Sequence, residues 1–247
     1  MERYFSVDYH GTPFVMFSVP HLVALGMIFF ICILLFLFRN RITKTQRLTF
    51  MYFIAILLIA NEIAFHIWKL SNGLWNIQTM LPLHLCSLMV YANAVMMVTK
   101  SYPLYEFLYF IGIGGAIQAL LTPDIGTYGF PHFRFFQTYI AHGFIVTTAI
   151  YMTVVERYRP YPKSLIKVAI GLNIYLIIVF IINMLIGSNY MFIAHKLETP
   201  TLLDYLGPWP WYILSLEVIG LTICLLLYMP FLIKDKFFKR IDKIQNV

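Results

Sequence analysis

The sequence predicts an all-α polytopic membrane protein, a bundle of seven transmembrane helices, from two observations. Of its 247 residues, 60% are apolar and 12% are charged, whereas charged residues make up about 25% of an ordinary soluble domain. The apolar residues also occur in blocks of about twenty, the length of helix that crosses about 30 Å of hydrocarbon. Such a chain does not stay dissolved in water. Soluble enzymes, nucleic-acid-binding proteins and disulfide-stabilised domains are therefore excluded.

Seven apolar blocks follow one another along the chain, and residues that stop a helix separate them. The first block ends at the basic stretch 39–41, and it is expected to stay in the membrane because no small-residue cleavage site follows it. The other breaks are Asn72-Gly73, Thr122-Pro123-Asp124, Pro160-Tyr161-Pro162 and Gly207-Pro208-Trp209-Pro210. The predicted spans are residues 20–38, 48–67, 81–98, 104–121, 134–155, 165–186 and 210–232. The gaps are short, so residues 1–247 are expected to form a single integral membrane domain.

The distribution of charge predicts the orientation. The net charge is +7, and the cations cluster at the ends of apolar blocks, where they act as topology signals rather than as a nucleic-acid surface. Of the 18 Lys and Arg residues, all but Arg3, Lys69, Arg134 and Lys196 fall on one side of the predicted membrane. Cytoplasmic loops carry the excess of such residues. We therefore expect a multi-pass protein of the cell membrane with its N-terminus outside and its C-terminus in the cytoplasm. No nucleic-acid partner is expected, and the oligomeric state is left open.

Polar residues concentrate in the outer halves of six of the seven spans. Their depth follows from the direction of each span and a rise of about 1.5 Å per residue, which puts Cys86 about 7–8 Å and His142 about 12 Å from the outer ends. The layer consists of Asn61, Glu62, His66, His84, Cys86, Gln118, His142, Asn183 and Glu217. The inner half shows little beyond Asn93 and Asn173. Ionisable groups at such depth usually face a cavity or each other, so the layer is the predicted site. Each member alone can also serve as an ordinary interhelical hydrogen bond.

Cys86 is the residue in this layer that most favours catalysis. Cys32 and Cys224 lie among apolar residues in the inner halves of their spans, where a thiol behaves as a small hydrophobe. A nucleophilic thiolate needs a neighbouring base. His84, two positions away, points to another side of the same helix, so His142 is the favoured partner.

Two other uses of the same residues stay open. Glu62 and His66 are four residues apart on one helix face, which suits either a carboxylate that orients a histidine or a simple local pair. Together with His84 and His142 they could supply metal ligands. The chain has no closely spaced pair of histidines, so neither a metal nor another cofactor is predicted.

Three strings carry a resemblance to a known family. LPLHLCSLMVY (81–91), FRFFQTYIAHG (133–143) and GSNYMFI…LLDYLGPWPWY (187–212) closely resemble the YwaF-like integral membrane proteins of Gram-positive bacteria, and the resemblance covers essentially the whole chain. That family is similar to eukaryotic multipass TMEM-type phospholipid acyltransferases, which use an intramembrane cysteine and histidine to move an acyl chain between phospholipids. The resemblance implies Cys86 as nucleophile and His142 as its histidine. A more distant hydrolase group has threonine at the first position, so cysteine here favours a thioester.

The leading hypothesis is therefore a lipid acyltransferase or acyl-ester hydrolase in the outer leaflet, with a membrane lipid as substrate. Cys86, activated by His142, would attack an acyl ester, and the thioester would pass its acyl group to a hydroxyl or to water. Other members of the layer would orient the pair or stabilise the oxyanion.

Three alternatives compete with this hypothesis. A small-solute or proton transporter or channel could use the layer as its binding site, and the glycines 112, 114 and 115 loosen the fourth span, although no matching break exists elsewhere. A zinc hydrolase of the ceramidase or adiponectin-receptor type needs a histidine pair in the last span, where this chain offers only Glu217. An assembly partner without activity is the fourth possibility.

Overall fold

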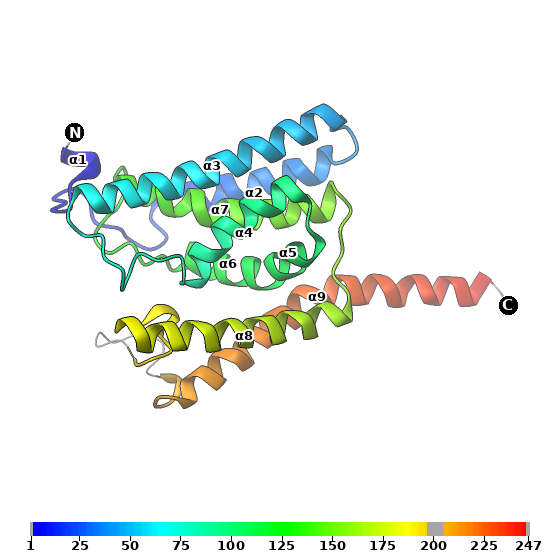
Figure 1. The fold of residues 1–247 in the computed structure, drawn as a ribbon. Helices are drawn as coiled ribbons and strands as arrows, with labels where there is room; N and C mark the ends of the chain where they lie inside the picture. Colours follow the sequence, from blue (N-terminus) through cyan, green and yellow to red (C-terminus); the bar gives the residue numbers. More distant parts are fainter. Residues whose placement is uncertain (1, 197–204, 246–247) are drawn as a thin grey trace.

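The computed structural model describes residues 2–196 and 205–245, and every regular element in this part of the chain is a helix. A helix lies in each of the predicted spans (Figure 1). They are α2 (Val19–Phe38), α3 (Lys44–Ser71), α4 (Leu85–Thr99), the continuous segment α5 (Tyr102–Phe107), η1 (Leu108–Gly112) and α6 (Ile113–Leu121), α7 (Phe133–Val154), α8 (Pro162–Ile186) and α9 (Trp211–Gln245). The short helices α1 (Glu2–Phe5) and η2 (Tyr190–Phe192) lie in connecting segments.

Five helical segments within the described residues are long and apolar enough to cross a membrane: α2, α3, Tyr102–Leu121, α8 and Trp211–Lys236. The helix α4 is apolar but has only 15 residues. The helix α7 has 22 residues, but threonines, Gln137 and His142 lower its hydropathy. The chain is thus an all-helical membrane protein.

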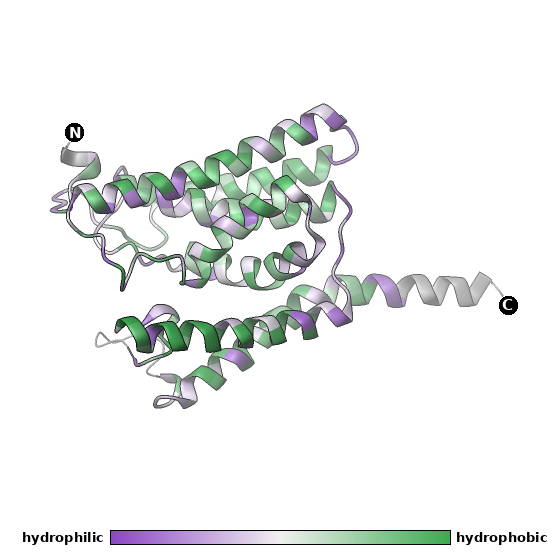
Figure 2. Cartoon of the chain, viewed as in Figure 1, coloured by the Kyte–Doolittle hydropathy of each residue, from purple (hydrophilic) through white to green (hydrophobic). Residues whose placement is uncertain are grey.

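The helix α7 forms the centre of the bundle, which explains its composition. It packs against α2, α3, α4, α6 and η1, and 12 of its 22 residues are buried. By contrast, α8 and α9 lie on one side of the remaining helices (Figure 1), and α8 buries only Ser164, Val168, Val179 and Asn183. Figure 2 shows α8 as an almost continuously hydrophobic helix. A central helix can carry polar groups because neighbouring helices satisfy them, whereas a helix that faces lipid cannot.

The two ends of the bundle are named here by their connections. Figure 1 shows the N-terminus at one end and the C-terminus at the other. The outer end is formed by residues 2–18 and by connections 72–84 and 122–132. The inner end is formed by connections 39–43 and 155–161 and by the second half of α9.

Two helices begin four residues away from the predicted start, a larger difference than for the other helices, and local hydrogen bonds accompany both changes. The helix α3 starts at Lys44, ahead of residue 48, because Thr43 and Gln46 form a capping box. The helix α4 starts at Leu85, after the predicted start at residue 81. Pro82 disfavours a helical conformation at the preceding residue. The Leu81 N–H also donates to the Tyr190 hydroxyl at 2.8 Å, outside any helix.

The predicted fourth span is continuous but irregular. Its middle turn η1 is a π-helix, in which the Ile113 N–H donates to the Leu108 carbonyl five residues earlier. Gly112 closes this turn against α7, and a Cβ at Gly112 would lie 3.3 Å from Ile145 Cγ2. A larger residue at this position would therefore require the Ile145 side chain to shift by a few tenths of an ångström.

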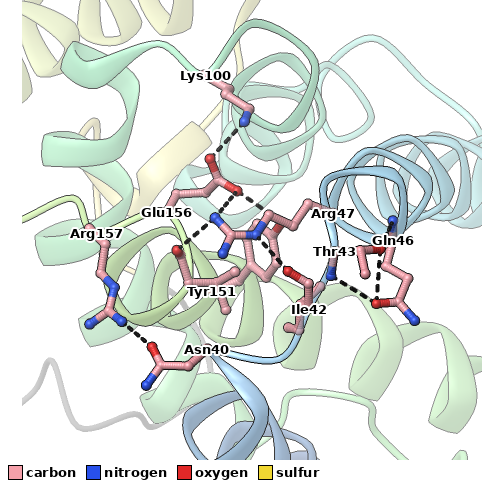
Figure 3. A network of polar contacts seen from close by, with 10 residues as sticks. Asn40, Ile42, Thr43, Gln46, Arg47, Lys100, Tyr151, Glu156 and Arg157 are labelled. Atoms are coloured by element: carbon pink, nitrogen blue, oxygen red, sulfur yellow. Dashed lines mark hydrogen bonds and ion pairs between the residues drawn. The ribbon is translucent and has the colours of Figure 1, made fainter.

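The inner end contains buried carboxylates, which corrects the expectation of little polarity there. Glu156 accepts from Lys100 Nζ at 2.6 Å and from the Tyr151 hydroxyl at 3.2 Å, and Arg47 lies 3.8 Å from it (Figure 3). Glu106, 3% exposed, pairs with Lys167 Nζ at 3.1 Å and accepts from the Ser164 hydroxyl. The expectation failed because the partners of these acids lie on other helices.

Candidate functional site

The geometry of the predicted site starts from the packing of α4 on α7. Lys100 follows α4 and pairs with Glu156, which follows α7, so the two helices run in the same direction. In their middle, the Thr148 hydroxyl of α7 donates to the Asn93 side chain of α4. This bond fixes the register of one helix against the other.

From that register, Cys86 and His142 lie at nearly the same depth. Cys86 is two turns towards the outer end from Asn93 and on the same face of α4. At about 1.5 Å per residue it lies about 10 Å from Asn93, while His142 lies about 9 Å from Thr148. The register therefore agrees with the predicted common depth. No hydrogen bond joins the two side chains in the structure.

Hydrogen bonding fixes the proton on the His142 ring. The Nδ1 atom lies 2.9 Å from the Thr138 carbonyl oxygen, one turn earlier in α7. A carbonyl only accepts, so Nδ1 carries the proton and Nε2 of the neutral ring has a free lone pair. Nε2 has no hydrogen-bond partner among the residues that the structure describes. It is the nitrogen that can act as a base.

Cys86 occupies the first turn of α4 and is half-buried. Because α4 starts at Leu85, the Cys86 thiol lies close to the N-terminal end of the helix. The predicted start at residue 81 would place it more than a turn inside. The N-cap His84 offers no side-chain cap. The backbone N–H groups of Leu85, Cys86 and Ser87 have no acceptor within the described part of the chain, as expected for an uncapped first turn. The Cys86 thiol and three N–H donors without an acceptor in the described residues thus share one helix end.

Glu62 and His66 form the predicted local pair on α3. Glu62 is 5% exposed, and its Oε1 lies 3.8 Å from His66 Nε2. The Trp75 indole N–H donates to His66 Nδ1 at 3.0 Å, so the proton of the neutral ring is on Nε2 and faces the carboxylate. At 3.8 Å the two groups form a local i, i+4 contact rather than a hydrogen bond, and the hydrogen bond from Trp75 is the one that orients the ring.

Arg134 is a half-exposed cation at the outer end that the sequence interpretation did not place in the predicted site. It had been counted as an outer topology cation, yet it lies in the first turn of α7 and is only half-exposed. Its guanidinium carbon is 4.3 Å from the centroid of the Phe65 ring, its Nη1 donates to Gln137, and it interacts electrostatically with Glu62. The sequence already indicates the partial burial of Arg134, because residue 134 lies inside the predicted span 134–155 and not in a connection.

Three predicted site residues have structural hydrogen bonds. Asn61 donates to the Gln137 carbonyl at 3.2 Å and ties α3 to α7. His84 accepts from the Met191 N–H at 3.3 Å. Asn183 is fully engaged in the turn after α8: its Oδ1 accepts from the Ser188 hydroxyl and the Tyr190 N–H, and its Nδ2 donates to the Tyr190 carbonyl.

Gln118 and Glu217 are not joined to the other predicted residues. Gln118 is exposed on α6 and Glu217 is half-buried on α9. Neither side chain has a hydrogen bond or ion pair with any residue that the structure describes. The predicted layer thus divides into the local pair Glu62–His66 on α3, Cys86 and His142 at a common depth on α4 and α7, the residues with structural hydrogen bonds, and the two separate side chains Gln118 and Glu217.

His132, which the sequence interpretation did not consider, caps α7 at the outer end. Its Nδ1 accepts from the Arg134 N–H at 3.1 Å, and its Nε2 donates to the Ser6 carbonyl at 3.0 Å. Burial lowers the pKa of His132 from its ordinary value, and the positive charge of Arg134 acts in the same direction. The neutral ring is therefore the form that the fold prefers.

An apolar groove runs between α2 and α7. It encloses about 500 Å³, within the range of about 300–1,000 Å³ of ligand pockets. Its walls include Val23, Met27, Tyr139, Ile140 and Phe144, together with Gly143, the neighbour of His142. Nearby residues of α2 such as Phe29 are exposed, so the groove opens on a surface suited to lipid.

No group of three or more His, Cys, Asp or Glu side chains that could hold a metal ion occurs within residues 2–196 and 205–236. In the comparisons with known proteins, the model of the TMEM164 family matches residues 16–228, which include every predicted site residue. No curated protein and no solved structure gives a significant match.

Proposed function

The chain belongs to the TMEM164 family, and from this premise and the geometry of the outer end we propose that it is a lipid acyltransferase or acyl-ester hydrolase that uses Cys86 and His142. The observation that carries the proposal is the uncapped start of α4, where the Cys86 thiol and three unsatisfied N–H groups share one turn. The resemblance of residues 81–91 and 133–143 to YwaF-like proteins supports the same pair.

We further propose seven spans in a cell membrane, with the N-terminus outside. The cations of connections 39–43 and 155–161 support this orientation, because an excess of Lys and Arg marks the cytoplasmic side. The short helix α4 and the polar helix α7 would cross the membrane inside the bundle, shielded from lipid by their neighbours. The reaction would then take place in the outer leaflet.

In the first step, His142 Nε2 takes the proton of the Cys86 thiol, and the sulfur attacks the carbonyl carbon of an acyl ester. The carbonyl oxygen becomes negative, and the unpaired N–H groups of Leu85, Cys86 and Ser87 are the donors that would stabilise this charge. When the ester C–O bond breaks, the leaving oxygen takes the proton from His142. The products are a lysolipid and an acyl thioester on Cys86.

In the second step, a hydroxyl group or water gives its proton to His142 Nε2 and attacks the thioester carbonyl. The C–S bond breaks, and the sulfur recovers the proton. Throughout, the hydrogen bond from Nδ1 to the Thr138 carbonyl keeps Nε2 available and stabilises the charged ring. No cofactor is needed for either step.

The surroundings of the pair suit a phospholipid. The groove between α2 and α7 offers an apolar channel for an acyl chain beside Gly143, next to His142 in the chain. Arg134 adds a positive charge at the outer end, which suits a phosphate group. Glu62 and His66 lie on the same side of the bundle and can tune the charge near Arg134.

The test is to incubate the purified full-length protein with a fluorescent-acyl phospholipid, with and without a lysolipid acceptor. Products are followed by mass spectrometry, and a thioester is sought after acid quenching. Wild-type protein should transfer or release the acyl group, and Cys86→Ala and His142→Ala should lose this activity. Cys32→Ala, which changes a thiol in the inner half of α2, is the matched control and should retain it. Full activity of Cys86→Ala would contradict the mechanism.

A small-solute or proton transporter is the second candidate. The π-helical turn η1 favours it, because π-helical turns often mark functional sites in helices. If wild-type protein leaves a broad panel of lipids unchanged and forms no thioester, flux assays in proteoliposomes become the next measurement. The side chains of Gln118 and Glu217 would then be the first to replace.

A further inference from the structure

A second cavity lies at the inner end, the opposite end of the bundle from Cys86. It encloses about 390 Å³ between the C-terminal ends of α2 and α7 and the middle of α9. Its charged lining is formed by Arg39, Arg157, Arg159 and Lys234, and its apolar lining includes Phe36, Val154 and Phe231. No acidic side chain is among the described residues that line it. The cavity therefore combines a cationic side with an apolar side.

Two of the three arginines of this cavity, Arg39 and Arg157, are held in place by neighbours that carry no charge. Arg39 stacks on Phe36, with 4.0 Å between its guanidinium carbon and the ring centroid. Arg157 donates to the Asn40 side chain, and Figure 3 shows it pointing away from Glu156. Arg159 forms two parallel bonds, of 3.0 and 2.7 Å, with the Asp235 carboxylate. Of the three arginines, only Arg159 pairs with a carboxylate within the described residues.

The backbone that carries two of these arginines is unusual and firmly held. Arg157 has a φ of +64°, a left-handed conformation that is unfavourable for residues other than glycine. The turn is fixed on both sides, since the Tyr158 hydroxyl donates to the Lys100 carbonyl at 2.8 Å and the Tyr102 hydroxyl donates to the Arg159 carbonyl at 2.6 Å. Strain that the surroundings maintain in this way is often linked to binding.

We propose that this cavity binds the phosphate-bearing headgroup of an anionic phospholipid in the leaflet at the inner end. Guanidinium groups suit phosphate because they donate two parallel hydrogen bonds to it. The apolar wall favours a lipid over a soluble phosphate. Phe36 is 52% exposed and the adjacent Leu37 is 61% exposed, so the wall continues into the surface of α2 that would face lipid. The headgroup occupies the cationic side, and the acyl chains follow α2.

The proposal is tested by titrating the full-length protein, in a neutral detergent, with a short-chain phosphatidate and measuring affinity by microscale thermophoresis. The comparison ligands are a phosphatidylcholine with the same chains and inorganic phosphate. Phosphatidate should bind at least about tenfold more tightly than either. Arg39→Gln and Arg157→Gln should each weaken phosphatidate binding about fivefold, as expected for the loss of one cation near a lipid phosphate.

Arg41→Gln is the matched control, because Arg41 is exposed close to Arg39 but does not line the cavity. It should leave the affinity unchanged, and Arg157→Lys, which keeps the charge, should lose less than Arg157→Gln. The proposal is overturned if wild-type protein does not bind phosphatidate, if Arg41→Gln weakens binding as much as Arg39→Gln, or if inorganic phosphate binds as tightly as the lipid. Melting curves of all variants establish that they fold equally. The acyltransferase assay is independent of every one of these results.

Discussion

The two ends of the bundle treat buried polar groups differently. At the inner end, Glu106 and Glu156 are each paired with a cation and a hydroxyl from other elements. At the outer end, Cys86 and the Nε2 atom of His142 have no hydrogen-bond partner among the described residues. Leaving a buried polar group unsatisfied costs free energy, whereas pairing it holds helices together. If the proposed function is correct, the paired acids of the inner end contribute stability, and the unpaired Cys86 and His142 of the outer end are the groups that carry the chemistry.

The largest expected effect is on activity and comes from the outer end. Replacement of Cys86 with alanine should reduce acyl transfer to the uncatalysed background, because the sulfur is the proposed nucleophile. The free energy of unfolding should change by less than about 1 kcal/mol, because only one half-buried, unpaired atom is lost. Chemical denaturation and the lipid assay on the same preparation measure both quantities. A variant that loses stability and activity together would remove the distinction between the two ends.

The next largest effect is a loss of stability, and it comes from the inner end. Glu156→Gln removes a carboxylate whose side chain is 9% exposed and leaves Lys100 and Arg47 without their partner. Breaking a buried ion pair costs about 3–5 kcal/mol, and the partial exposure of Lys100 reduces this to about 2 kcal/mol here. Thermal unfolding in detergent should show the loss, and Asp8→Asn at an exposed position should not. Equal melting temperatures for the two variants would contradict the assignment.

Asn183 provides a further test of the comparison, because it is an outer-end residue whose side-chain oxygen and nitrogen both form hydrogen bonds. Asn183→Ala leaves the Tyr190 N–H and carbonyl and the Ser188 hydroxyl without their partner. We expect a loss of about 1.5 kcal/mol in stability. The activity per folded molecule should be unchanged. A selective loss of activity would instead return Asn183 to the site that the sequence predicted.

The smallest effect is a pH dependence at the outer end. The pKa of His132 is lowered by burial, so the ring is neutral in the fold and gains a proton more readily when unfolded. Its contribution to stability is complete above the unfolded pKa of about 6.5 and is lost as the pH falls towards the folded pKa. Protonation of Nδ1 would also break the cap to the Arg134 N–H. His132→Asn keeps an acceptor but does not titrate, so its melting temperature should fall less than that of wild-type protein between pH 7 and pH 5.

The helices themselves could be predicted from the apolar blocks, and their ends only in part. The predicted span 20–38 matches α2 to within one residue, because the ends of this lipid-facing helix coincide with the ends of its apolar block. The start of α4 was misplaced because the bond from the Leu81 N–H to Tyr190 joins segments far apart in the chain. Such contacts are invisible to a pattern read along one helix.

The common depth of Cys86 and His142 was predictable from the sequence, and the contacts of the other candidate residues were not. Direction and rise placed Cys86 and His142 at one level, and the Asn93–Thr148 bond gives the same result. The structural role of Asn183 and the partial burial of Arg134 depend on the turn after α8 and on the Phe65 ring. Both contacts require knowledge of which helix faces which.

The π-helical turn η1 also rotates the second half of its span about the helix axis relative to the first half. One extra residue in a turn offsets everything that follows by about 100° relative to an uninterrupted α-helix. The face that α5 presents with Tyr105 is thereby set independently of the face that α6 presents with Gln118. Deletion of a single residue within Leu108–Gly112 would restore a regular helix and turn the outer half as a whole. The number of residues in this one turn thus sets the rotation of α6, at the outer end, relative to α5.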